Sequence, residues 1–153
     1  MGLTSSEDSN SLNEASKLTV AYFSDQTQPV INTPAEKYLQ NRGIEAPYPD
    51  SIGWVTQARA GEGAMIAIVK GPDGPAAIQL TYVTPAGNKS SIEPQHRTYV
   101  AQDSWQSGGG FTITNADAPE RTVIAEGIED ALSLSQAKVG ATIIASLGLS
   151  NLG

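Results

Sequence analysis

The stretch TVIAEGIEDALSLSQAKVGATIIASLG, residues 122–148, decides the fold of this protein. Two short apolar runs, Thr122–Ala125 and Thr142–Ala145, flank a segment from Asp130 to Ala137 whose leucines and small residues suit a helix. Short apolar strands on either side of a helix are typical of parallel neighbours in a covered sheet. The stretch therefore predicts a β-α-β unit with parallel strands.

A glycine and three carboxylates lie at the junction between the first strand and the helix, namely Glu126, Gly127, Glu129 and Asp130. Ligands of open α/β sheets bind outside the carboxyl ends of the strands, and Mg²⁺ prefers oxygen ligands. Glu126 and Asp130 are therefore candidate metal ligands, and Gly127 would permit a tight or left-handed turn and a close ligand approach. The carboxylates are also explained without a ligand, because acidic residues in a first turn complement the helix macrodipole.

Upstream of this unit, residues 12–115 predict two helices followed by antiparallel strands. A helix over residues 12–24 is predicted by apolar residues at helical spacing, namely Leu12, Ala15, Leu18 and Tyr22. A second helix is predicted to begin at a capping box that runs from Thr33 to Glu36, with Pro34 at the first helical position, and to end at Gly43. The polar residues 1–11 are predicted to be a disordered tail.

The middle of the chain changes to the period of strands. Strands are predicted over residues 52–56, 64–70, 76–83, 97–100 and 111–114. Ile78, Leu80 and Tyr82 alternate with polar residues, so the strand that carries them is predicted to bury one face only. The overall prediction is an α/β protein: an α+β region with an antiparallel sheet, followed by a unit with parallel strands.

The composition of the chain bears on whether it binds nucleic acid, zinc or a membrane. Nine lysines and arginines against sixteen aspartates and glutamates give a net charge of −7, the opposite of the basic surface that carries non-specific nucleic-acid binding. Lys89, Arg97 and Arg121 would form a small basic patch for template or nucleotide, although exposed cations often only interact with water. The chain has no cysteine, so it has no cysteine-based zinc site, and it has no long apolar run, so we expect a cytoplasmic protein without a membrane span.

The segment EGIEDALSLSQAKVGATIIASLGLS, residues 126–150, resembles the first half of the Toprim domain of bacterial and phage primases and type IA topoisomerases. The likeness includes the E-G-x-x-D pattern, the helix and the second strand. It implies that Glu126 is the acidic residue of the active centre and that Asp130 matches an aspartate often found four residues later. It also implies Mg²⁺ or Mn²⁺ as the cofactor.

The upstream sequence is similar to the primase core that precedes a Toprim domain. Tyr38-Leu39-Gln40-Asn41-Arg42-Gly43 looks like a helix ending in Tyr-Leu-x-x-Arg-Gly, and the strands from Ala64 to Val83 look like the sheet that follows it. After the tail of residues 1–11 that composition predicts, the resemblance implies a primase-core-like region over 12–115 and a partial Toprim domain over 120–153. It implies a phage or plasmid DNA primase, with single-stranded DNA template, nucleoside triphosphates and a replicative helicase as partners.

Two departures from the family limit what this chain is expected to do alone: it lacks the second acidic motif, and without cysteines it cannot carry the zinc-binding, template-reading module usual in cellular primases. The Asp-x-Asp motif that completes the metal site in the family is not present before Gly153. We therefore expect the chain to be inactive by itself, as part of a primase in which that motif follows. Two alternatives remain open: another Toprim enzyme, of the nuclease or topoisomerase kind, and a degenerate, non-catalytic Toprim module that binds a replication partner.

Overall fold

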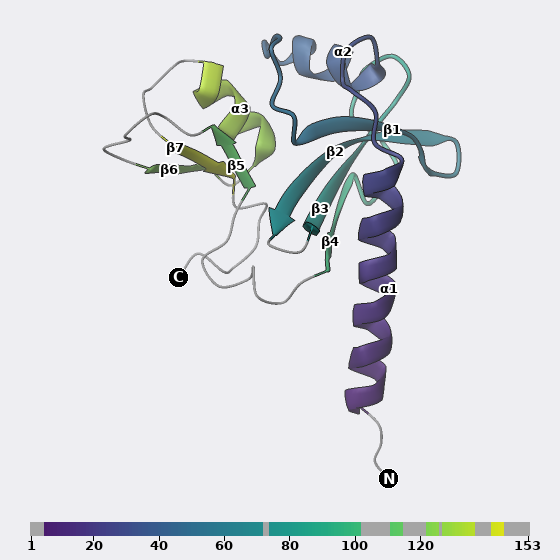
Figure 1. Ribbon diagram of the computed structural model, residues 1–153. Helices are drawn as coiled ribbons and strands as arrows, with labels where there is room; N and C mark the ends of the chain where they lie inside the picture. Colours follow the sequence, from purple (N-terminus) through teal and green to yellow (C-terminus); the bar gives the residue numbers. More distant parts are fainter. Residues whose placement is uncertain are drawn as a thin grey trace.

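The computed structural model describes residues 5–71, 74–101, 111–114, 122–125, 127–136 and 142–145, and within them it is a mixed α/β structure. The helices are α1 (Ser5–Asp25), α2 (Pro34–Asn41) and α3 (Ile128–Gln136). The strands are β1 (Ile52–Arg59), β2 (Glu62–Gly71), β3 (Gly74–Val83), β4 (His96–Val100), β5 (Phe111–Thr114), β6 (Thr122–Ala125) and β7 (Thr142–Ala145). Figure 1 shows β1–β4 as one sheet, with α1 projecting beyond its edge.

The first four strands form an antiparallel sheet in the order β1-β2-β3-β4. Each strand pairs with the next strand in the sequence, as in hairpins. In the pairing of β1 with β2, Trp54 lies opposite Met65. The outer side of β1 is bridged by the segment between α1 and α2. There the backbone of Gln28 exchanges two hydrogen bonds of 2.8 Å with the backbone of Trp54. The five predicted strands are confirmed, most of them longer than predicted.

Helices cover both faces of this sheet. On one face, Val20 of α1 packs in a cluster with Ile66, Ile78 and Leu80. On the other face, residues of α2 and α3 share a second cluster with Met65 and its neighbours. The predicted one-sided burial of β3 is therefore wrong: every residue from 76 to 83 is buried. Burial of the polar side chains could not be predicted from alternation, because they can be buried when they form hydrogen bonds within the protein. For example, the Gln79 Nε2 donates to the Thr98 Oγ1 at 3.2 Å.

The first helix differs from its prediction at its start and in its buried face. It begins at Ser5, so residues 5–11, predicted as a disordered tail, are helical. Extending a formed helix adds one hydrogen bond for each residue fixed, which favours this extension once the helix has started. Leu18 and Tyr22 of the predicted apolar face are 71% and 57% exposed, whereas Val20 is buried. The face that α1 buries is thus set by the sheet beneath it.

The second helix begins at Pro34 and ends before Gly43, as predicted, but its N-terminal cap differs from the prediction. Gly43 has a φ of +79° and donates to the Gln40 carbonyl at 2.9 Å, and Ile44 donates to the Leu39 carbonyl at 2.9 Å. These two bonds form a Schellman motif, which explains the stop at the glycine. The predicted capping box does not form. Instead, the Thr33 hydroxyl donates to the Val30 carbonyl, and the Glu36 carboxylate accepts a hydrogen bond of 3.1 Å from the backbone N–H of Asn32.

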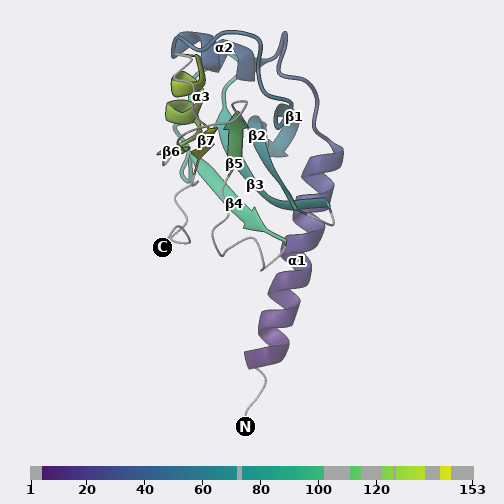
Figure 2. The same ribbon diagram turned by 60° about the vertical axis from the view of Figure 1, so that its left-hand side comes forward.

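The C-terminal strands form a second sheet in the order β5-β7-β6. β6 and β7 are parallel, with Thr122 opposite Thr142 and Ala125 opposite Ala145, and α3 lies between them in the chain. β5 pairs with β7 in the antiparallel sense. Figure 2 shows α3 close to α2, on the side of the molecule away from α1. None of the described helices is long and apolar enough to cross a membrane.

Candidate functional site

The first turn of α3 is held in place by apolar side chains. Ile128 and Ala131 are buried in the cluster that α2 and the antiparallel sheet also line. The Ala131 amide donates to the Gly127 carbonyl at 3.2 Å, which closes the first turn. Because β6 and β7 are parallel, their carboxyl ends lie at the same edge, and this turn directly follows the end of β6. Glu126 lies outside the described residues, so its role stays a prediction.

Glu129 connects this turn to α2. Its carboxylate Oε1 accepts a short hydrogen bond from the hydroxyl of Tyr38, 91 residues earlier in the chain. The Arg42 guanidinium lies 4.3 Å above the centre of the same tyrosine ring. Burial and, after it, the Glu129 carboxylate raise the pKa of Tyr38 to about 12. The hydroxyl therefore stays protonated and donates a hydrogen bond to the carboxylate. The interpretation of Glu129 as a solvated helix-dipole residue is therefore incomplete.

Gly127 is not explained by the local fold. Its φ is outside the left-handed region, so of the tight or left-handed turn that was predicted, the left-handed form does not occur. Among the described residues, a Cβ at this position would meet only the Glu129 Oε2, at 3.8 Å, which is ordinary van der Waals contact. Neither backbone strain nor crowding thus requires a glycine. The second predicted reason, close approach of a ligand to the backbone, remains.

The remaining predicted metal ligand, Asp130, is exposed in the same turn. It points away from the buried face that Ile128 and Ala131 form, so it is accessible to a ligand from solvent. No group of three metal-ligating side chains occurs among the described residues. The predicted Mg²⁺ site accordingly stays a prediction that depends on Glu126.

The predicted basic patch of Lys89, Arg97 and Arg121 stays a prediction, because only two of its three residues are described. Arg97 lies opposite Leu80 on β3, and so on the α1 face of the sheet, whereas the α3 turn lies on the other face. Lys89 is half-exposed in the connection between β3 and β4. Arg121 lies outside the described residues. Arg42, which sequence reasoning did not select as a site residue, is the cation that the structure brings next to the turn, through Tyr38.

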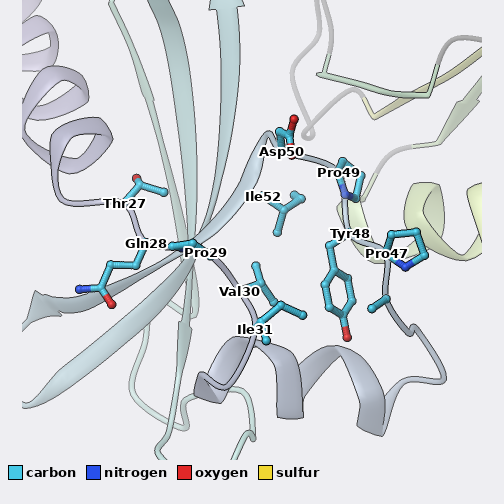
Figure 3. A pocket seen from close by; sticks show the side chains of 11 residues that line it. Thr27, Gln28, Pro29, Val30, Ile31, Pro47, Tyr48, Pro49, Asp50 and Ile52 are labelled. Carbon is cyan, nitrogen blue, oxygen red and sulfur yellow. The ribbon is translucent and has the colours of Figure 1, made fainter.

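A separate open cavity of about 600 Å³ lies between the segments 27–31 and 46–52. Figure 3 shows its apolar side chains, among them Ile31, and the Tyr48 ring extending toward α2. Burial, followed by the Glu36 carboxylate, raises the pKa of Tyr48 to about 12. No residue that the sequence selected as a site residue lines this cavity.

Comparison with known proteins identifies a family and no characterised relative. Residues 14–104 match the model of a family described as "Domain of unknown function (DUF7146)", and the chain therefore belongs to that family. The matched residues comprise most of α1, α2 and the whole antiparallel sheet. Neither a curated protein nor a solved structure was found to match the chain.

Proposed function

We propose that this member of the DUF7146 family is part of a DNA primase that makes RNA primers in phage or plasmid replication. The proposed active centre is a Mg²⁺-dependent nucleotidyltransferase site of the Toprim kind at the first turn of α3. One observation supports it above the others: Tyr38, from the Tyr-Leu-x-x-Arg-Gly motif, donates a hydrogen bond to Glu129, from the segment that resembles Toprim.

This contact supports the proposal because it joins two segments that lie far apart in the chain. Each resembles a part of the same family, and contact between them is what a site supported by the upstream core would require. Their meeting point is also the edge where parallel strands β6 and β7 end, and it is there that open α/β sheets bind ligands.

The residues of the turn suit the chemistry proposed for them. In primer synthesis a primer hydroxyl attacks the α-phosphorus of a nucleoside triphosphate and pyrophosphate leaves, and Mg²⁺ supplies charge neutralisation and positioning. Glu126 would hold the metal or accept the proton of the attacking hydroxyl. Asp130 would add an accessible carboxylate, and Gly127 would leave room for a phosphate beside the backbone. The Asp-x-Asp motif implied by the family resemblance would complete the set.

The decisive test is Glu126→Gln in a protein that carries this sequence together with the Asp-x-Asp strand. The change keeps the shape of the side chain and removes one charge, so folding should persist while primer synthesis falls by ~100-fold or more. A matched control is Glu14→Gln, because Glu14 is exposed on α1, the helix that covers the opposite face of the sheet. Glu129→Gln would be a poor control, since Glu129 accepts the Tyr38 hydrogen bond.

The alternative functions predict other outcomes of the same experiment. A helix-dipole role for Glu126 is worth about 0.3–1 kcal/mol, so Glu126→Gln would slightly lower the melting temperature and leave synthesis intact. That result, with the two variants equal, would contradict the proposal and favour a non-catalytic module that binds a replication partner. Cleavage of DNA by the unaltered protein, without primer synthesis, would favour a Toprim nuclease.

A further inference from the structure

We propose that the cavity between the segments 27–31 and 46–52 is a docking groove for a partner protein, which inserts an apolar side chain flanked by lysine or arginine. The inference does not depend on primer synthesis, because no residue of the α3 turn lines the cavity. The cavity lies within residues 14–104, so the proposal gives the family domain an interaction surface of its own.

The cavity has the size and the lining of a binding site. Its volume of about 600 Å³ lies within the range of about 300–1,000 Å³ that is typical of ligand pockets. Apolar side chains make up most of its lining, and Figure 3 shows Val30, Ile31 and Ile52 on one side and the Tyr48 ring on the other. An apolar side chain placed between them would leave water and gain the free energy of burial.

The fold holds the walls of the cavity in place. Val30 and Ile52 are buried in one core cluster, and Tyr48 packs against that cluster. The two backbone hydrogen bonds of 2.8 Å between Gln28 and Trp54 attach the first segment to β1. A partner would therefore meet walls that are already formed, which lowers the ordering cost of binding.

Ile31 lies at the open side of the cavity. Its side chain is 49% exposed, although it is a large aliphatic residue. Single exposed apolar side chains are common, but this one lines a cavity whose other side chains are mostly apolar. Small molecules are usually enclosed by their pockets, so an open cavity with an exposed aliphatic rim suits a protein segment that covers it.

The charged groups that the structure places at this cavity are carboxylates. Asp50 lines the cavity, is exposed and forms no ion pair with another described residue. After burial, the carboxylates of Glu36 and Glu45 raise the pKa of Tyr48, so both act on this wall of the cavity. No lysine or arginine is among the lining residues.

The nearby cations of α2 are engaged elsewhere. Lys37 packs against the turn at Gly87, and the Arg42 guanidinium covers the ring of Tyr38. The negative charge at the cavity is therefore left for a partner to complement. Charge complementarity of this kind selects and orients a partner. A second copy of this chain is a poor occupant, because each copy carries a net charge of −7 and the two would repel.

The test uses three short peptides with blocked ends that differ only in charge: Gly-Lys-Leu-Leu-Lys-Gly, Gly-Ser-Leu-Leu-Ser-Gly and Gly-Glu-Leu-Leu-Glu-Gly. Each is titrated into the full chain labelled with ¹⁵N, and the amide chemical shifts give the binding site and the dissociation constant together. The lysine peptide should shift amides within the segments 27–31 and 46–52. It should bind about 2- to 5-fold more tightly than the serine peptide at low salt, and the glutamate peptide should bind most weakly.

Two pairs of variants separate the cavity from the rest of the acidic surface. Asp50→Asn and Glu93→Gln each remove one charge from an exposed carboxylate, but Glu93 does not line the cavity. Only Asp50→Asn should reduce the preference for the lysine peptide. Ile31→Ser and Ile92→Ser each remove an exposed isoleucine, and only Ile31→Ser should weaken the binding of all three peptides, by about 5-fold. Exposed positions are chosen so that the variants keep the fold.

Several results would overturn the proposal. One is the absence of shifts within the two segments at millimolar peptide, and another is equal binding of the lysine and glutamate peptides. Equal effects of Asp50→Asn and Glu93→Gln would mean that the lysine peptide responds to net charge alone. Sedimentation that shows a dimer, abolished by Ile31→Ser, would assign the cavity to a second copy. Binding of 3-methylbutylamine as tight as that of the lysine peptide would assign it to a small amine.

Discussion

Replacing Gly127 with alanine should separate the needs of the fold from the needs of a ligand. The backbone at this position is outside the left-handed region, and the new methyl group would meet only the Glu129 Oε2 at 3.8 Å among the described residues. A glycine that alanine can replace without strain mainly adds freedom to the unfolded chain. Gly127→Ala should therefore raise the free energy of unfolding by about 0.4–1 kcal/mol. For a chain of 153 residues, this raises the melting temperature by about 1–4 °C.

The assay pairs urea unfolding with Mg²⁺-dependent synthesis on the same preparations. If the space beside Gly127 serves a phosphate, the stabilised variant should lose synthesis, because its methyl group occupies the path of the ligand to the backbone. A more stable protein with lower activity is the pattern expected when a residue serves function at a cost in stability. Unchanged synthesis would remove the ligand explanation for this glycine.

Gly63→Ala is the matched control for the structural part. At Gly63 the same methyl group would overlap the ring of Trp54 and lie 2.7 Å from the Val55 carbonyl oxygen. Overpacking of this kind costs about 1–3 kcal/mol, so this variant should unfold at lower urea concentration. If Gly127→Ala is destabilised as much as Gly63→Ala, the reasoning from backbone angle and open space is refuted.

Two further predictions concern the cluster around Arg59, which anchors the connection between β3 and β4. Arg59 pairs with Glu62 at 2.7 Å and donates to the Ser90 hydroxyl and to the Ile92 and Pro94 carbonyls. A lysine cannot make this set of bonds, so Arg59→Lys should lower the free energy of unfolding, measured in urea, by ~2 kcal/mol. A loss below ~0.5 kcal/mol would contradict this prediction. A hydrogen bond from Ser90 and, after it, the interaction with Arg59 lower the pKa of the Glu62 carboxyl below its ordinary value of 4.5. The ionised Glu62 therefore stabilises the fold above pH 4.5, and this stabilisation is lost as the pH falls through the lowered pKa. The stability difference between the unaltered protein and Glu62→Gln should therefore shrink on acidification toward pH ~3, and a constant difference would count against the shift.

Local signals in the sequence predicted the elements well where the chemistry is local. The end of α2 followed from Gly43, because few other residues adopt the left-handed angle that its stop requires. The strands followed from runs of apolar and β-branched residues between turns. The β-α-β order followed from the stretch at 122–148, whose two apolar runs are each too short for a helix.

The buried face of α1 and the contact between α2 and α3 depend on tertiary packing, which local sequence patterns do not predict. Leu18 and Tyr22 have helical spacing with Leu12, yet α1 buries Val20, because the sheet selects the face that fits its own side chains. The contact between Tyr38 and Glu129 joins residues that no local pattern connects. The motif Tyr38-Leu39-Gln40-Asn41-Arg42-Gly43 directed attention to this helix, but nothing in it indicated that its tyrosine contacts Glu129.

The hydrophobic core places the α3 turn within the body of the protein. Ile128, Ala131 and Leu132 of α3 belong to the same cluster as Leu39 of α2 and Trp54 of β1. The turn is therefore positioned by residues within the range 14–104 that defines the family, and a change in that range reaches the turn through packing as well as through Tyr38. If the α3 turn is an active centre, the DUF7146 domain is the support that holds it in place, and variants of its core should alter metal dependence as well as stability.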